Sequence, residues 1–124
     1  MPAIVVADDH PLMRLLARRS LEDAGYEVIE ATDGRDALEL VSLHHPAAVL
    51  LDWQMPELTG PAVCRRLRSD PAFAATPVVI MTGHNEESFK RAAREAGASD
   101  CLVKPVEPSA LLACVEQLLQ ATLA

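Results

Sequence analysis

AAVLLD, residues 47–52, is an apolar run that ends in an aspartate, and AIVVADD, residues 3–9, repeats this pattern near the start of the chain. Uninterrupted apolar runs of about five residues are typical of parallel strands that are buried on both faces of a sheet. Ligands bind to such sheets just beyond the carboxyl ends of the strands. The two runs therefore predict that Asp8, Asp9 and Asp52 meet at one edge of a parallel sheet.

These three predicted neighbours are carboxylates that repel one another. Two unit charges about 4 Å apart repel by roughly 4 kcal/mol at an effective dielectric constant of about 20, so the cluster needs a cation. No cysteine or histidine has the spacing of a zinc site, whereas carboxylates, water and a phosphate oxygen are ligands of Mg²⁺. We therefore predict a magnesium site with Asp8 and Asp9 as its acidic cradle, with Mn²⁺ as the alternative ion.

The rest of the chain alternates between strand and helix patterns. Pro11 is suited to the first turn of a helix, with His10 or Asp9 as its cap. Gly25 and Gly97 are suited to helix ends. The predicted strands are 3–7, 27–31, 47–51, 78–82 and 101–104. The predicted helices are 11–24, 35–44, 60–69, 86–96 and a last helix with the apolar stripe Leu111, Leu112, Val115, Leu118 and Leu119.

Strands that alternate with helices in this way require right-handed crossovers and a parallel sheet covered on both faces. The predicted fold is therefore a three-layer, doubly wound α/β domain, (βα)5, with a five-stranded parallel sheet. In its first helix, the helical spacing predicts a buried face that includes Leu16 and a solvent-facing Arg14. The pattern also predicts a solvated face on the third helix, with Arg65, Arg66 and Arg68.

Two more polar side chains stand at the carboxyl ends of predicted strands, Thr82 at the end of the fourth strand and Lys104 at the end of the fifth. A carboxylate beside a metal can act as a nucleophile and form an acyl phosphate, and Asp52 on the central strand is best placed to do so. A hydroxyl and an ammonium group are donors suited to the oxygens of a phosphoryl group. The edge of the sheet therefore predicts phosphoryl transfer to Asp52.

The composition excludes several classes of protein. The 124 residues fit one domain, and a net charge of −7 argues against direct binding to nucleic acid. Cys64, Cys101 and Cys114 are an odd number without close pairing, which is typical of reduced thiols in the cytoplasm. The chain shows no leader-like start and no apolar stretch long enough to span a bilayer. We expect a cytoplasmic protein that contacts neither nucleic acid nor membrane directly.

The site residues also carry a family resemblance. The chain resembles the receiver domain of bacterial response regulators over its whole length, 1–124, as a single domain. The resemblance rests on five elements in a characteristic order and spacing: Asp8-Asp9, Asp52-Trp53-Gln54-Met55-Pro56, Gly60, Thr82 and Lys104-Pro105. It implies a flavodoxin-like strand order, 2-1-3-4-5.

The resemblance also implies a function in two-component phosphorelay signalling. Asp52 would accept a phosphoryl group from a phosphohistidine on a sensor histidine kinase or a histidine phosphotransfer protein. Mg²⁺ would be held by Asp9, Asp52 and the backbone carbonyl of Gln54, with Asp8 acting mostly through metal-bound water. The chain would not be an enzyme, beyond self-catalysed phosphoryl transfer and autodephosphorylation.

Other positions receive roles from the same resemblance. Thr82 and Lys104 would bind the phosphoryl oxygens, and a cis Lys104–Pro105 peptide would help to aim Lys104. Gln54 and His84, each two positions beyond a site residue, would tune how quickly water removes the phosphoryl group. Trp53 is expected to cover the pocket.

The output surface is the place where the sequence departs from the family. A downstream protein partner would read the fourth helix, the fifth strand and the fifth helix, in a monomer or weak homodimer. Receivers commonly carry Tyr or Phe at this switch position, where the chain has Cys101. Either the surface is coupled differently, or the protein is a phosphorelay intermediate with little surface switching. A redox role for Cys101 is disfavoured, because the sequence indicates no basic neighbour.

Other classes of protein differ from this interpretation in domain context or in single residues. The receiver is expected to stand alone, and the alternative is a receiver excised from a larger regulator or a hybrid histidine kinase. An aspartyl-phosphate phosphatase would need an acid where the chain has Gln54. A flavin or nucleotide binder would need a Gly- or Ser-rich phosphate loop where the chain has Asp8 and Asp9. A degenerate receiver that serves only as a scaffold is disfavoured, since the chain has all five site residues: Asp8, Asp9, Asp52, Thr82 and Lys104.

Overall fold

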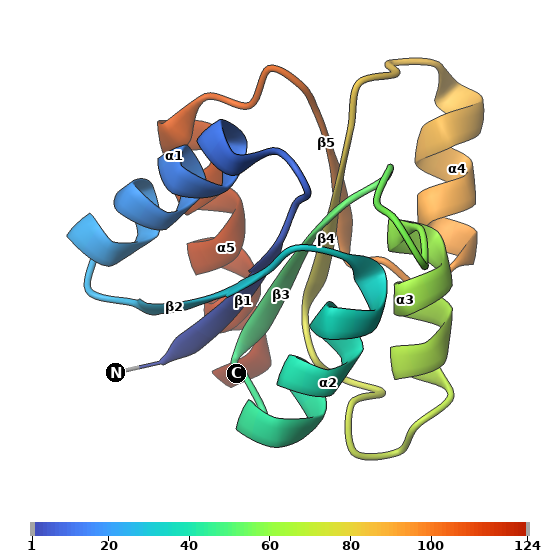
Figure 1. Ribbon diagram of the computed structural model, residues 1–124, viewed down its shortest axis with the longest axis horizontal. Coiled ribbons are helices and arrows are strands. Elements are labelled where there is room, and N and C mark those ends of the chain that lie inside the picture. The colour runs from blue at the N-terminus through green and yellow to red at the C-terminus, as the bar shows by residue number, and fades with distance from the viewer. Residues whose placement is uncertain (1, 124) are drawn as a thin grey trace.

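The apolar runs form one parallel sheet in the computed structural model, which describes residues 2–123 (Figure 1). The predicted strand order, 2-1-3-4-5, is confirmed. Its strands are β1 (Ala3–Ala7), β2 (Glu27–Ala31), β3 (Ala48–Asp52), β4 (Val78–Thr82) and β5 (Asp100–Val103). β3 ends one residue later than predicted because Asp52 still pairs with Met81 of β4, and β5 ends before Lys104.

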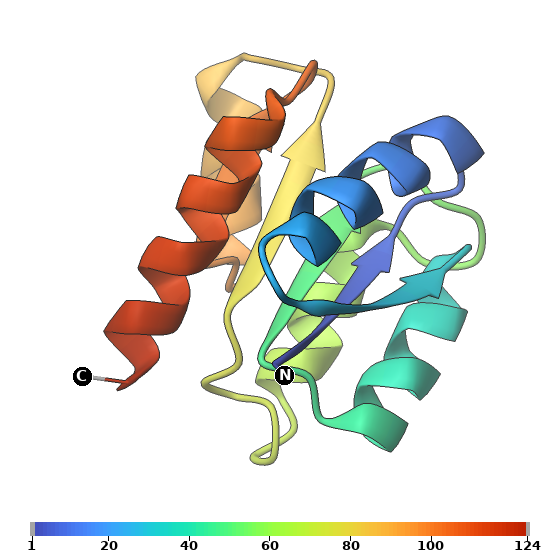
Figure 2. The ribbon, with the colours of Figure 1, turned by 90° about the vertical axis from the view of Figure 1, so that its left-hand side faces the viewer.

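The helices cover both faces of this sheet. They are α1 (Pro11–Asp23), α2 (Gly34–His44), α3 (Gly60–Arg68), α4 (Glu87–Glu95) and α5 (Pro108–Leu123). Figure 2 shows α1 and α5 together on one face, and α2, α3 and α4 pack on the other. The predicted three-layer, doubly wound fold is therefore confirmed. Within residues 2–123, no helix combines the length and the apolar composition needed to cross a membrane.

The sheet separates two apolar cores. Successive residues of a strand point to opposite faces, so Leu51 and Ile80 belong to the core under α2, α3 and α4. Leu50 and Val79 belong to the core under α1 and α5. Every residue of β3 and β4 is buried, as the uninterrupted apolar runs predicted. Polar groups of these two central strands are therefore found at their ends.

Turn residues end the helices where the sequence predicted. Gly25 and Gly97 follow α1 and α4 with φ angles of +96° and +102°, a region that favours glycine. At the start of α1, His10 is the N-cap residue. The prediction for Leu16 was wrong: 48% of its surface is exposed, beside the exposed Leu12 and Leu15. The buried residues of α1 are Ala17 and Leu21, so the buried stripe of the helix is narrower than its apolar pattern.

Arg68, the last residue of α3, joins two loops at the amino edge of the sheet, the one between α3 and β4 and the one between α4 and β5. Its Nε donates to the carbonyl oxygen of Gly97 at 2.8 Å, and its Nη1 donates to the carbonyl oxygens of Phe73 and Thr76 at 3.0 and 2.7 Å. Its Nη2 donates to Ser99 Oγ at 3.4 Å. The predicted solvated role was therefore wrong for Arg68, because helical periodicity carries no information about carbonyl groups in distant loops.

Replacing Arg68 with Ala is expected to lower the free energy of unfolding by about 2 kcal/mol or more, because three carbonyl oxygens lose a charged donor. Urea unfolding followed by circular dichroism measures this change. Arg65→Ala, an exposed position on the same helix, is the matched control and should stay within about 0.5 kcal/mol of the native chain. Equal losses in the two variants would contradict the role of Arg68.

Candidate functional site

Parallel register brings the predicted site residues to one edge of the sheet. Ala7 pairs with Leu51, so the acidic residues that follow β1 lie next to Asp52 at the end of β3. Asp8, Asp52 and Thr82 are buried, with 2%, 7% and 1% of their surfaces exposed, whereas Asp9 is exposed. Burial of two neighbouring carboxylates is unfavourable unless a positive charge lies close to them.

The predicted acidic cluster is present. Asp8, Asp9 and Asp52 each offer a carboxylate oxygen, and these oxygens all lie within 4.8 Å of one another. Hard oxygen donors of this kind suit a small divalent cation such as Mg²⁺, whereas zinc sites use nitrogen and sulfur ligands. The donor set therefore fits the predicted metal.

Lys104 supplies a positive charge inside the cluster. Its Nζ lies 2.9 Å from Asp52 Oδ1 and 3.5 Å from Asp8 Oδ2. Burial raises the pKa of Asp52, and Asp8 adds to this increase, while the ammonium of Lys104 opposes it. Burial alone would lower the pKa of Lys104, but the hydrogen bond and charge of Asp52, together with Asp8, raise it overall. Lys104 is therefore the protonated partner of the two buried carboxylates.

Backbone contacts hold the side chains at this edge. The peptide bond between Lys104 and Pro105 is cis, and the Lys104 N–H donates to the carbonyl oxygen of Thr82 at 2.7 Å. The Asp8 carboxylate accepts a hydrogen bond from the N–H of His10 at 2.9 Å. These contacts orient Asp8 and Lys104 toward the same space.

Gly60 explains one element of the sequence motif. Its N–H donates to the carbonyl oxygen of Trp53 at 2.9 Å, so the loop after β3 folds back onto the strand end. A Cβ atom at position 60 would lie 2.7 Å from the carbonyl oxygen of Asp52, which is too close for a real contact. A glycine therefore lets α3 begin directly against the backbone of Asp52.

An open cleft of about 260 Å³ lies over Asp52. Its lining residues are Asp52, Trp53, Gln54, Thr82, Gly83, His84 and Lys104. Gln54 and His84 are exposed and Trp53 is half-buried. The cleft therefore brings the residues predicted to accept and bind a phosphoryl group together with those predicted to lie at its mouth.

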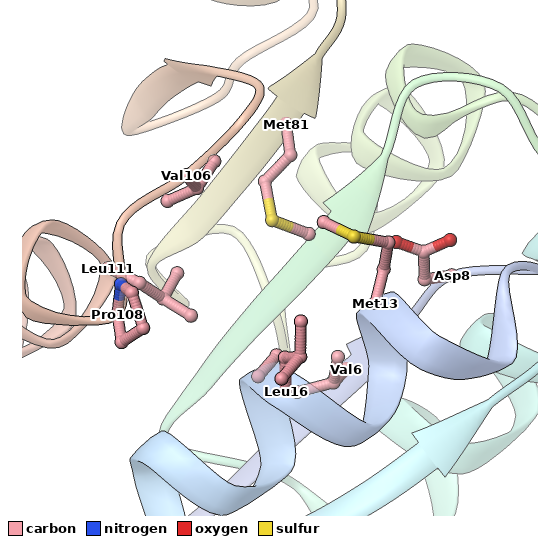
Figure 3. Close-up of a pocket in the computed structure, with 9 residues that line it drawn as sticks. Val6, Asp8, Met13, Leu16, Met81, Val106, Pro108 and Leu111 are labelled. Atoms are coloured by element: carbon pink, nitrogen blue, oxygen red, sulfur yellow. The ribbon is translucent and has the colours of Figure 1, made fainter.

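A second cavity, of about 80 Å³, lies on the α1 and α5 side of the sheet. Figure 3 shows the side chains of Met13, Leu16, Met81 and Leu111 around it, with Asp8 at its edge. Its lining is mostly apolar, so it offers a phosphoryl group no set of hydrogen-bond donors. The chemistry of the site belongs to the cleft over Asp52.

Arg14 is a site residue that the sequence did not reveal. It was predicted to face water, but its Nη1 donates to the carbonyl oxygen of Asp8 at 2.7 Å. Its Nε donates to Glu30 Oε1 on β2 at 3.2 Å. Because Glu30 is distant in the chain and the acceptor on Asp8 is a backbone oxygen, no sequence pattern could have identified this contact. Arg14 thus connects β2 to the acidic loop.

Cys101 is half-buried on β5 and packs against the core under α2, α3 and α4. The positive charges of Lys90 and Arg94 favour its thiolate, an influence that the sequence did not indicate. Burial outweighs them and, together with Asp100, raises the pKa of the Cys101 thiol. The thiol stays protonated at neutral pH, which argues against redox reactivity.

Comparison with known proteins identifies a family for this chain. Residues 4–116 match the response regulator receiver domain. Response regulator MprA of Mycolicibacterium vanbaalenii is 43% identical over 96% of this chain and 51% of its own length. The chain spans about half the length of the curated relatives it matches.

Solved structures of receiver domains share the fold. The receiver domain of the Francisella response regulator 1452 has a TM-score of 0.92 at 29% identity, covering 98% of this chain and 99% of its own. The chemotaxis response regulator CheY4 of Vibrio cholerae has a TM-score of 0.90 at 30% identity, covering 95% and 98%. The chain therefore belongs to the response regulator receiver domain family, whose members accept phosphoryl groups in two-component signalling.

Proposed function

We propose that Asp52 is the phosphoacceptor of this receiver domain. One observation carries the proposal: Asp52 stands at the end of the central strand, 2.9 Å from the ammonium of Lys104 and within a cluster of three carboxylates. No other acidic residue of the cluster also borders the cleft that Trp53 and Thr82 line.

Receiver domains bind Mg²⁺ in an acidic pocket, and the three clustered carboxylates fit that ion. In this chain we assign the ligands to Asp9, Asp52 and the backbone carbonyl of Gln54, with Asp8 acting through water. Mn²⁺ is the alternative ion. The bound cation would neutralise charge on the phosphoryl group and on the carboxylates.

The transfer step forms a bond between a carboxylate oxygen of Asp52 and phosphorus. It breaks the bond between phosphorus and a histidine nitrogen of the donor, which keeps the electron pair. Thr82 donates a hydrogen bond to a phosphoryl oxygen. The ammonium of Lys104, which contacts Asp52 before the transfer, then also binds the negatively charged phosphoryl oxygens. Water later attacks phosphorus and restores the carboxylate, and Gln54 and His84 at the mouth set the rate of that step.

Receiver domains interact with histidine kinases and downstream effectors. The donor proposed for this chain is a sensor histidine kinase or a histidine phosphotransfer protein, and the effector binds the surface of α4, β5 and α5. The receiver would work as a monomer or weak homodimer in the cytoplasm and would catalyse only its own phosphorylation and dephosphorylation. Phosphorylation of Asp52 is common to a stand-alone receiver of residues 1–124, to part of a longer regulator or hybrid kinase, and to a phosphorelay intermediate. The intermediate differs in that it would need little switching of the effector surface.

Incubation with Mg²⁺ and acetyl phosphate should add one phosphoryl group to the native chain, measured as intact mass. Asp52→Ala should show no gain, because the acceptor oxygen is absent. Asp33→Ala, which removes a half-buried acid outside the cluster, is the control for nonspecific labelling and should gain the group. A native chain that stays unmodified would refute the phosphoacceptor assignment.

Asp9→Asn should weaken Mg²⁺ binding by roughly tenfold or more, because it removes one of three carboxylate charges that face the ion. Trp53 lines the same cleft, so its fluorescence during a Mg²⁺ titration reports binding. Asp23→Asn, an exposed acid at the end of α1, is the matched control. Equal affinities of Asp9→Asn and the native chain would remove Asp9 from the ligand set.

Lys104→Met should separate metal binding from phosphoryl transfer. Mg²⁺ should bind several-fold more tightly, since a positive charge beside two carboxylates is lost. The rate of labelling by acetyl phosphate should fall by roughly tenfold or more, because the developing charge on the phosphoryl oxygens loses its ammonium partner. Fluorescence titration and intact mass measure the two effects. Weaker Mg²⁺ binding or an unchanged labelling rate would contradict this role.

A further inference from the structure

Three aromatic rings meet at the mouth of the cleft over Asp52. The imidazole ring of His84 stacks on the ring of Phe89, with centroids 4.2 Å apart and an angle of 9° between the planes. Phe89 also meets the ring of Trp53 edge-on, at a centroid distance of 5.1 Å and an angle of 60°. Phe89 is therefore the central ring of the three, and it belongs to α4.

The two outer rings belong to the two strand ends that form the proposed phosphoryl site. Trp53 directly follows Asp52, and its N–H donates to the carbonyl oxygen of Met81 at 2.8 Å. His84 follows β4, and its N–H donates to Thr82 Oγ1 at 3.1 Å. Asp52 is thus the chain neighbour of Trp53, and the Thr82 hydroxyl is hydrogen-bonded to His84, the two residues whose rings contact Phe89.

The ring cluster contrasts with β5, where Cys101 occupies the usual place of an aromatic side chain. The chain has four Phe, Tyr and Trp residues in all, and two of them belong to this cluster: Trp53, which lines the cleft, and Phe89, which contacts it. The other two pack elsewhere: Phe73 in the core under α2, α3 and α4, and Tyr26 against the core under α1 and α5. The aromatic contacts beside the phosphoryl site therefore reach α4 rather than β5.

The start of α4 meets the loop after β4 through the stack of His84 on Phe89 and a 3.7 Å approach of His84 Nδ1 to Glu86 Oε2. Its N-cap residue, Glu86, makes no side-chain capping hydrogen bond, and its buried residue, Ala93, lies in the second half of the helix. Before it, the loop residue Gly83 has open space where a side chain would stand. The stack on Phe89 is thus a principal contact for the first turn of α4.

We propose that Phe89 is a positioning residue that couples phosphorylation of Asp52 to the first turn of α4. The coupling rests on the proposed function. When the Thr82 hydroxyl turns toward a phosphoryl oxygen, its hydrogen bond to the His84 N–H changes, and the stacked ring transmits the shift to Phe89. Trp53 transmits the change from the β3 side, so α4 responds without an aromatic ring on β5.

Hydrogen–deuterium exchange of the α4 amides, residues 87–95, tests the coupling with Mg²⁺ alone and with Mg²⁺ plus acetyl phosphate. Intact mass gives the phosphorylated fraction of each sample. Phosphorylation should change exchange in the first turn of α4 by several-fold in the native chain. Phe89→Leu should take up the phosphoryl group but lose most of this change, and Phe89→Tyr, which keeps the ring, should retain it. His84→Ala is a second variant that removes the stacked imidazole and should also weaken the response.

Cys101→Ala is the matched control on β5 and should respond as the native chain does. Loss of the response in Cys101→Ala, or its persistence in Phe89→Leu and His84→Ala, would overturn the coupling while leaving the phosphoacceptor role intact. A native chain that gains the phosphoryl group without any change of exchange in α4 would likewise overturn the coupling and leave the phosphoacceptor role intact. Failure of the native chain to gain the group would instead overturn the proposed function, and the coupling with it.

Discussion

Burial of a parallel sheet on both faces is the constraint on which the rest of this structure depends. The central strands have no solvent-facing side, so polar groups are confined to their ends. Parallel register then brings Asp8, Asp52 and Thr82 together at one edge, in surroundings that make an unpaired negative charge unfavourable. The ammonium of Lys104 offsets part of the negative charge of Asp8 and Asp52, and a bound divalent cation would offset the rest. The same burial that stabilises the fold thus makes the site dependent on positive charge.

The sequence predicted the sheet and the clustering of the acids, because these follow from apolar periodicity and from the parallel arrangement. The strand order came from the family resemblance. Prediction from the sequence failed where a long side chain reaches a distant backbone oxygen. Arg14 and Arg68 were both predicted to face water, and both donate to carbonyl groups. Helical spacing identifies the face on which a residue stands, but it cannot indicate which loops will fold over that face. Phe89 was missed for a related reason, since its ring partners belong to the ends of two other elements.

The replacement of a large aromatic side chain by Cys101 is therefore better understood together with Phe89. A thiol on β5 fills less volume and stays protonated within its apolar surroundings. The aromatic surface beside the proposed phosphoryl site comes instead from the strand ends and from α4. A receiver with this arrangement has its aromatic contacts with α4, whereas β5 carries a thiol that packs against the core.

Arg68 gives this arrangement a mechanical consequence. Through the carbonyl oxygen of Gly97, it anchors the segment that follows α4 at the amino edge of the sheet, opposite Asp52. The first turn of α4 is held instead by the ring contacts of Phe89 with His84 and Trp53. A rigid helix fixed at one end behaves as a lever with its fulcrum at that end, so the displacement grows with distance from Gly97. Under the coupling proposed above, a small rearrangement near Asp52 would be expressed as a rotation of α4 about Gly97, with the largest displacement at the first turn of the helix.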